Sequence, residues 1–178
     1  MFSLLTSTRP NYSNDIVLII AGASKKTFSV HKSTLSQSSR FLRVACSKNW
    51  KEGCENTVRL PSADVDAVIV YVHWLYSKDL DTDLMEDLMT LEASDKPTFK
   101  NLGKLWILGN FLEDNASMNA TIDRFLRKCD ALPRMGVRVD AVEFIWANTM
   151  EDCPLCKLVL DILSARFLEQ TLVRKGSR

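Results

Sequence analysis

The sequence predicts an α+β fold in which helices pack on a small sheet and continue into a helical C-terminal extension. Two short strand-like runs, residues 15–21 and 26–31, lie close together, and a third covers residues 57–60. The other periodic segments have apolar residues at helical spacing, and most of them follow the third strand. A hairpin, short helices, one more strand and then only helices is typical of an α+β domain with a helical tail.

The first two strands are expected to form a hairpin. The run DIVLIIA, residues 15–21, is apolar and β-branched, which suits a strand with at least one buried face. The turn residues GASK follow at 22–25. In KTFSVH, residues 26–31, Phe28 and Val30 alternate with polar residues, so this segment is the predicted partner strand.

Short helical segments are expected between the hairpin and the third strand. Ser33 or Thr34 is a suitable N-cap for a helix that runs to Ser38, and residues 41–45 place apolar side chains on one helical face. Residues 47–56 are rich in charge, Gly and Asn, and are predicted to form a loop.

The segment after Pro61 predicts an amphipathic helix. Ser62 is the expected N-cap, with Asp64 and Asp66 near the positive end of the helix dipole. The apolar stripe expected to face the core consists of Val65, Val68, Ile69, Val72 and Tyr76.

Two helix pairs are expected in the C-terminal half, separated by a boundary at residues 133–137. In the first pair, Gly103 and Gly109 allow close helix contact. The stripes of that pair are Leu102, Leu105, Trp106 and Leu112, then Met118, Ile122, Phe125, Leu126 and Cys129. The stripes of the second pair are Val139, Val142, Ile145, Trp146 and Thr149, then Leu155, Leu158, Val159, Ile162 and Phe167. Asp152 and Pro154 suit the start of the last helix.

Charge and composition exclude several classes of protein. The 178 residues include 23 basic and 22 acidic side chains, a net charge of +1, without the basic excess of a nucleic-acid-binding protein. No apolar run reaches the length of about 18 residues that a membrane span needs. Residues 79–95 contain seven acidic and no basic side chains, which indicates either a solvated face or a docking site for a basic partner.

The cysteine pattern and the N-terminus favour a cytosolic or nuclear protein. The five cysteines are odd in number and irregularly spaced, so reduced thiols are expected and no disulfide framework. The first ten residues carry a short apolar patch with no cationic region before it, unlike a secretory signal.

The chemical groups of an enzyme are missing from the sequence. His31 and His73 are the two histidines, and no nucleophile, phosphate-binding or metalloprotease motif is present, so we expect neither catalysis nor a cofactor. Cys153 and Cys156 form a CxxC spacing, but a zinc site needs four ligands and no second pair is present. They remain a weak candidate for a metal or redox site, beside the simpler interpretation of two thiols in the first turn of a helix.

Several motifs together resemble the BTB/POZ domain family. The residues that carry the resemblance are Asp15, Phe28, Val30, His31, Lys32, Leu35 and Ser38 to Phe41, followed by NWKEG, VRLPSADVDAV and WLYSKDL. Residues 102–128 resemble the last helix pair of that domain in the form seen in many fungal stand-alone BTB proteins. The resemblance implies a BTB/POZ domain at residues 13–130, an N-terminal segment at 1–12 and a C-terminal helical extension at 131–178.

This resemblance implies a protein–protein interaction module with a small three-stranded sheet capped by helices. Many family members are substrate adaptors or scaffolds of cullin-RING ubiquitin ligases, and they contact the cullin through a loop with a hydrophobic-x-Glu motif. Trp50 and Glu52 occupy the matching positions. A large aromatic side chain there is a suitable interface anchor, although Trp50 could equally fold back onto its own domain.

The alternative function that the resemblance implies is a homo-oligomerising scaffold or a transcription-associated module without cullin binding. Asp15 and Lys32 match the charge pair that lines the dimer groove of transcription-factor members. The two could pair across a homodimer or, more simply, within one chain. Exposure of Trp146 or Phe167 in the C-terminal helices would indicate a further interface.

Overall fold

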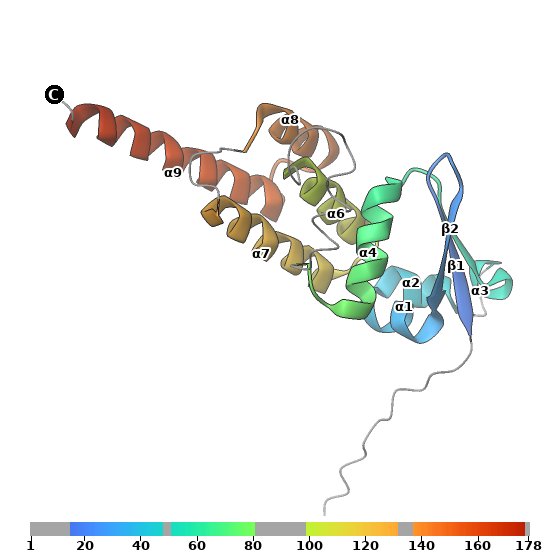
Figure 1. The fold of residues 1–178 in the computed structure, drawn as a ribbon. Helices are drawn as coiled ribbons and strands as arrows, with labels where there is room; N and C mark the ends of the chain where they lie inside the picture. The colour runs from blue at the N-terminus through green and yellow to red at the C-terminus, as the bar shows by residue number, and fades with distance from the viewer. Residues whose placement is uncertain (1–14, 48–50, 81–98, 132–136, 177–178) are drawn as a thin grey trace, which may run out of the picture.

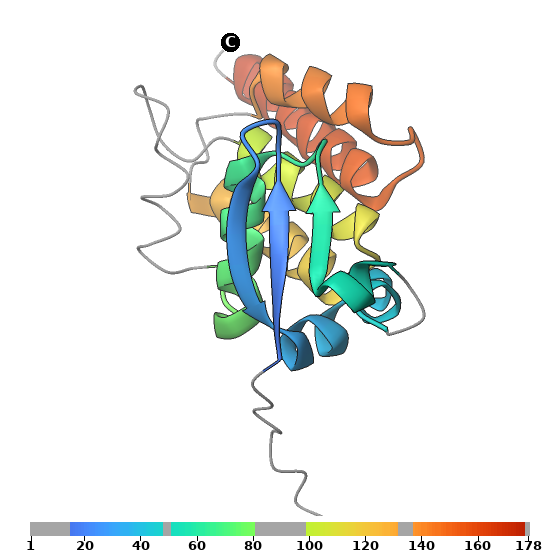
Figure 2. The same ribbon diagram turned by 90° about the vertical axis from the view of Figure 1, so that its right-hand side faces the viewer.

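The computed structural model describes residues 15–47, 51–80, 99–131 and 137–176, and it confirms the predicted α+β fold (Figure 1). The strands β1 (Ile16–Ala21), β2 (Lys26–His31) and β3 (Thr57–Leu60) form one sheet in the order β2-β1-β3. β1 is antiparallel to β2 and parallel to β3. Helices cover one face of this sheet, and Figure 2 views the molecule from the other face.

The hairpin forms as predicted. Val17 pairs with Val30 and Ile19 with Phe28, and these four side chains lie on the helical side of the sheet. Gly22 opens the turn with a φ of 67°, and a side-chain carbon there would lie 2.6 Å from Val65. Glycine therefore meets both the backbone and the packing requirements of this turn.

The segment between the hairpin and β3 is more helical than expected. α1 (Lys32–Ser38) begins directly after β2, with His31 at the N-cap position, so the predicted caps Ser33 and Thr34 lie inside the helix. α2 (Arg40–Ala45) begins after Ser39, whose side chain accepts the Leu42 N–H. The expectation of a loop at 47–56 was wrong in part, because α3 (Lys51–Glu55) forms there.

The helix α4 (Val65–Ser77) begins two residues later than predicted. Its N-cap is Asp64, not Ser62, because the Asp64 carboxylate accepts the N–H groups of Asp66 and Ala67 at 3.1 Å. The predicted apolar stripe was also partly wrong, since Tyr76 is 51% exposed. α4 packs against α6 on one side and against β2 and α1 on the other. The buried residues therefore occupy a broader face, namely Ala67, Val68, Val70, Tyr71, Trp74 and Leu75.

The C-terminal half consists of α6 (Phe99–Phe111), α7 (Asn115–Ala131), α8 (Val139–Asn148) and α9 (Pro154–Gly176). α6 packs against α4, α7 and α8, and the expected close contacts at its glycines are confirmed. A side-chain carbon at Gly103 would lie 2.9 Å from Ile145, and one at Gly109 would lie 3.2 Å from Met118. Small residues on α6 thus allow both neighbouring helices to approach closely.

The two C-terminal helices share the hydrophobic core with the rest of the chain. Ala141, Ile145, Leu155 and Val159 are buried in the same cluster as the inner residues of the sheet. Figure 1 shows α9 running out beyond α8. Phe167, in the second half of α9, is 69% exposed. Within the described residues, no helix is long and apolar enough to cross a membrane.

Candidate functional site

The predicted hydrophobic-x-Glu motif is only partly covered by the structure. Trp50 lies outside the described residues, and Glu52 lies half-buried in the first turn of α3. α3 packs on α2, where a side-chain carbon at Gly53 would overlap the Ser47 carbonyl oxygen. Only glycine allows the two backbones to come this close, so Gly53 lets α3, which carries Glu52, pack against the end of α2.

An exposed apolar cluster lies on the neighbouring surface of α2. Phe41 contacts Phe111, the last residue of α6, with ring centroids 5.4 Å apart. Phe111 is 58% exposed and Val44, almost one turn from Phe41 on α2, is 46% exposed. We call Phe41, Val44 and Phe111 the corner patch. Sequence reasoning missed it, although Phe111 was recognisable as an apolar residue outside the predicted α6 stripe.

Charged residues border the corner patch. The guanidinium of Arg40 lies 3.8 Å from the carboxylate of Glu113, and both side chains are largely exposed. An exposed pair of this kind contributes about 0–1 kcal/mol to stability. Its charges are available to a partner protein, and charges at the rim of an interface mainly affect orientation and association rate.

The backbone next to Phe111 is held by a buried carboxylate. Asp114 is fully buried at the α6–α7 corner, and it accepts the Tyr71 hydroxyl at 2.9 Å and the Ser117 N–H at 3.0 Å. Glu113 beside it has a φ of 52°, which turns the chain sharply between the two helices. α4 and α7 thus fix the position of the corner.

A second buried contact ties the same corner to α2. The Ser39 hydroxyl, at the break between α1 and α2, donates to the Leu112 carbonyl. The same oxygen accepts the Leu42 N–H at 3.0 Å. Because Ser39 is fully buried, both groups depend on it for a hydrogen-bond partner. Buried hydrogen bonds from α2, α4 and α7 therefore hold the corner that carries Phe111.

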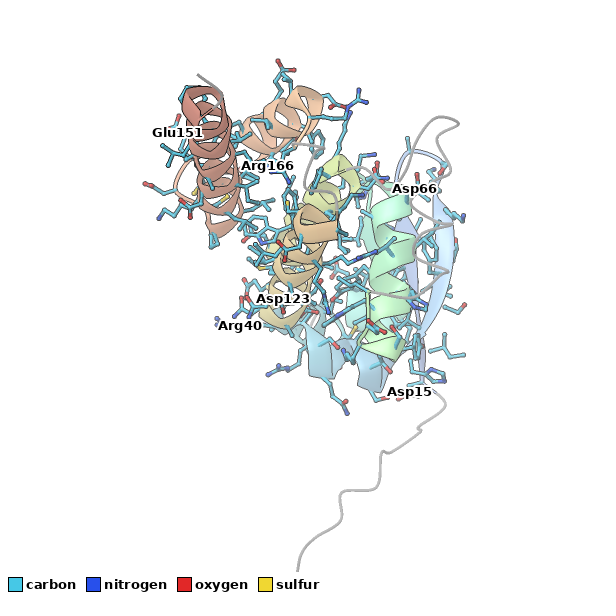
Figure 3. All side chains as sticks on the ribbon, turned by 60° about the vertical axis from the view of Figure 1, so that its left-hand side comes forward. Asp15, Arg40, Asp66, Asp123, Glu151 and Arg166 are labelled. Atoms are coloured by element: carbon cyan, nitrogen blue, oxygen red, sulfur yellow. The ribbon has the colours of Figure 1, made fainter. Side chains whose placement is uncertain are left out.

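The predicted charge pair lies at the end of the sheet where β1 begins. Figure 3 shows Asp15 at the opposite end of the molecule from Asp66, the second residue of α4. The Lys32 N–H donates to the Asp15 carbonyl at 2.9 Å, while the Asp15 side chain is exposed and that of Lys32 is half-buried. The backbones are thus joined, and the role of the two charges in a dimer stays a prediction.

A groove of about 710 Å³ adjoins the corner patch. It lies between the hairpin turn, the β3–α4 loop, α6 and α8, and Phe111 forms one of its walls. Its surface is mainly apolar, with contributions from Leu60, Ile107 and Phe144. Its charged lining includes Lys104, whose ammonium lies 2.9 Å from the Asp64 carboxylate.

The other predicted candidates lie on α8, on α9 and at the turn between them. None of the described cysteines forms a disulfide, and Cys153 and Cys156 lie at the α8–α9 turn. Among the described residues, no three His, Cys, Asp or Glu side chains are grouped as a metal ion would need. Trp146 is half-buried against the core, whereas Phe167 is exposed.

Comparison with known proteins identifies the family. The family model described as BTB/POZ domain matches residues 7–104, which is more than half of the chain. No curated protein matches the sequence. The matched range includes all three strands, α4 and the start of α6, in agreement with the resemblance in the hairpin and α1. The chain therefore belongs to the BTB/POZ domain family, a family of protein–protein interaction modules.

Proposed function

We propose that this protein is a substrate adaptor or scaffold for a cullin-RING ubiquitin ligase in the cytosol or nucleus, and that α3 and the corner patch contact the cullin. The observation that carries the proposal is the exposure of Val44 on α2, the helix on which α3 packs, and of Phe111, which contacts Phe41 of α2. Trp50, the expected anchor, is two residues before Glu52 in the sequence.

The corner patch has the physical properties of an interface centre. Large aromatic side chains contribute most of the binding energy in many interfaces, because they bury much area at a small entropic cost. Phe111 is exposed, yet the backbone that directly follows it is held by the buried contacts of Asp114 and Ser39. The entropic cost of ordering this surface when a partner binds is therefore small.

The surrounding charges suit the rim of such an interface. Glu52 and the Arg40–Glu113 pair offer both signs of charge near the apolar centre. Rim charges orient an incoming partner and exclude mismatched ones, while apolar residues at the centre supply affinity. A surface with charges at its rim and apolar residues at its centre favours a specific protein partner over non-specific hydrophobic association.

The test is a calorimetric titration of the full chain with a cullin N-terminal domain. We expect binding that weakens by roughly ten-fold or more for Phe111→Ala, as for an interface anchor that contributes more than about 1.4 kcal/mol. The double variant Trp50→Ala, Glu52→Ala should also lose affinity. Phe167→Ala is the matched control, since Phe167 is equally aromatic and 69% exposed but lies on α9.

Three outcomes distinguish the possibilities. Loss of affinity in the Phe111 and Trp50/Glu52 variants with an unchanged Phe167 variant supports the proposed contact. Binding that none of these substitutions weakens would leave the adaptor role but exclude this surface. A wild-type chain that does not bind any cullin would exclude the adaptor role.

Self-association is the second candidate function, as a homo-oligomerising scaffold or transcription-associated module. It is favoured by Ile16 and Leu18, two exposed apolar residues on the open face of β1, next to the predicted charge pair of Asp15 and Lys32. Sedimentation of the wild type and of Asp15→Ala tests it. A monomer at all concentrations would exclude a homodimer, and a dimer unaffected by Asp15→Ala would exclude that charge from its interface.

A further inference from the structure

Two cysteine thiols lie together where α8 turns into α9. Cys153 directly precedes Pro154, the first residue of α9, and Cys156 follows in the first turn. Cys153 is half-buried and Cys156 is fully buried. The turn itself is closed by the Cys153 N–H, which donates to the Met150 carbonyl at 3.0 Å. One thiol is thus accessible from outside and the other lies behind it.

The spacing of the two residues suits a disulfide bond. A disulfide needs Cα atoms about 4.4–6.8 Å apart. Three residues of an α-helix rise about 4.5 Å along its axis, which falls within that range. The Cys153 sulfur already lies over the first turn, since it accepts the Cys156 N–H at 3.2 Å. A disulfide between them requires the Cys156 side chain to turn from Thr149 toward the Cys153 sulfur.

The surroundings give the two thiols different chemical properties. The Cys153 sulfur lies at the start of the 23-residue helix α9, where it accepts the Cys156 N–H. Burial raises the pKa of the Cys156 thiol, the contact with Thr149 lowers it in part, and the neighbouring Cys153 and Glu151 raise it further. Because Cys153 is half-buried and Cys156 is fully buried, Cys153 is the thiol that a small disulfide from solution meets first, and Cys156 reacts in the second step.

Thr149 holds the buried thiol in place. Its hydroxyl lies 3.1 Å from the Cys156 sulfur and donates to the Ile145 carbonyl at 2.7 Å. Either the Thr149 hydroxyl or the Cys156 thiol can supply the hydrogen in their contact. The contact points the thiol toward the end of α8, on the side away from bulk solvent.

We propose that Cys153 and Cys156 form a thiol–disulfide exchange site that takes a small disulfide of the oxidised glutathione class as its substrate. The Cys153 thiolate attacks one sulfur of that disulfide, and the S–S bond breaks to release one small thiolate, which takes a proton from water. Cys156 then loses its proton to water and attacks the Cys153 sulfur. A Cys153–Cys156 disulfide forms as the mixed S–S bond breaks, and the second small molecule leaves as a thiolate that takes a proton back from water. Two electrons pass from the protein to the small disulfide.

The test incubates the full chain in buffers of reduced and oxidised glutathione, followed by acid quenching, alkylation and peptide mass mapping. The wild type is expected to form the Cys153–Cys156 disulfide while its circular dichroism stays that of the folded protein. Cys156→Ser should accumulate glutathione on Cys153. Cys153→Ser should slow modification at position 156 by roughly ten-fold or more, because the remaining thiol is buried and protonated.

Cys54 is the internal control, because it is an exposed cysteine in α3. The proposal requires Cys153 to react faster than Cys54 in the same sample. A wild type that carries only mixed disulfides, or that leaves Cys153 and Cys156 reduced when Cys54 is already modified, would overturn it. Since both of these results are read on the wild type, the proposal does not depend on the folding of any variant.

Discussion

The hydroxyl of Tyr71 on α4 donates a hydrogen bond of 2.9 Å to the carboxylate of Asp114 at the corner between α6 and α7. Both side chains are buried, so neither can replace this partner with bulk water. The contact joins residues that are 43 positions apart in the sequence. It fixes the corner that presents Phe111, and it is therefore both a stabilising contact and a support of the proposed interface.

Replacing Tyr71 by phenylalanine should destabilise the protein by about 1.5–3 kcal/mol, the range for a hydrogen bond to a charged group. The ring stays in place, but the Asp114 carboxylate loses one of its partners. Chemical denaturation measures the change. Tyr76→Phe is the control, because the Tyr76 hydroxyl bonds exposed groups of His31 and should matter less. Equal losses in the two variants would contradict the special role of Asp114.

The same pair predicts a dependence of stability on alkaline pH. Burial, the negative charge of Asp114 and the hydrogen bond to it raise the pKa of Tyr71 well above its ordinary value of 10.0. A raised pKa means that the stabilising contribution is complete below pH 10.0 and is lost as the pH rises beyond it. The difference in unfolding free energy between wild type and Tyr71→Phe should shrink above that pH. A constant difference would contradict the assignment.

Asp64 predicts the opposite dependence at acidic pH. Burial alone would raise its pKa, but hydrogen bonds from Lys104, Ala67 and Asp66 and the positive charge of Lys104 outweigh it and hold the pKa below 3.8. Because its pKa is lowered in the folded state, the ionised Asp64 carboxylate stabilises the protein above pH 3.8. This stabilisation is lost as the pH falls below that value. Asp64→Ala should therefore cost about 0.5–2 kcal/mol near neutral pH, as expected for a lost N-cap, and less in acid.

A second substitution at position 64 separates the cap from the charge. Asparagine caps helices about as well as aspartate, so Asp64→Asn should keep the cap of α4 and lose only the ion pair with Lys104. We expect it to be more stable than Asp64→Ala at neutral pH in denaturation experiments. If the two variants are equally unstable, the ion pair and not the cap supplies the stability.

The sign of the Gly103→Ala effect tests the contact between α6 and α8. In an open helix this substitution stabilises by about 0.5–1 kcal/mol. Here the new carbon would lie 2.9 Å from Ile145, so overpacking should destabilise by about 1–3 kcal/mol. Adding Ile145→Val should restore part of the loss in thermal or chemical unfolding. A stabilised single variant would show that α8 does not pack closely on α6.

The strands and most helices were predictable because their signals are local. The hairpin depends on two neighbouring apolar runs and a glycine turn, and Pro154 begins α9 as expected. The helix α3 was missed because a five-residue helix around Gly53 has weak intrinsic propensity and depends on packing against α2. The buried face of α4 was partly misassigned because a one-stripe pattern assumes one neighbour, whereas α4 has neighbours on two sides.

By itself, the sequence determined the α+β class and the order of the strands along the chain, because turns, caps and periodic apolar residues act over a few positions. The family was indicated separately, by the resemblance of several motifs to BTB/POZ domains. It also named Glu52, Asp15, Lys32 and the CxxC cysteines as candidates. The tertiary structure alone decided that Phe41 meets Phe111 beside α3, and that Tyr71 reaches Asp114. The physical reason is that exposure and buried hydrogen bonds depend on contacts between distant segments, which periodicity along one segment does not encode.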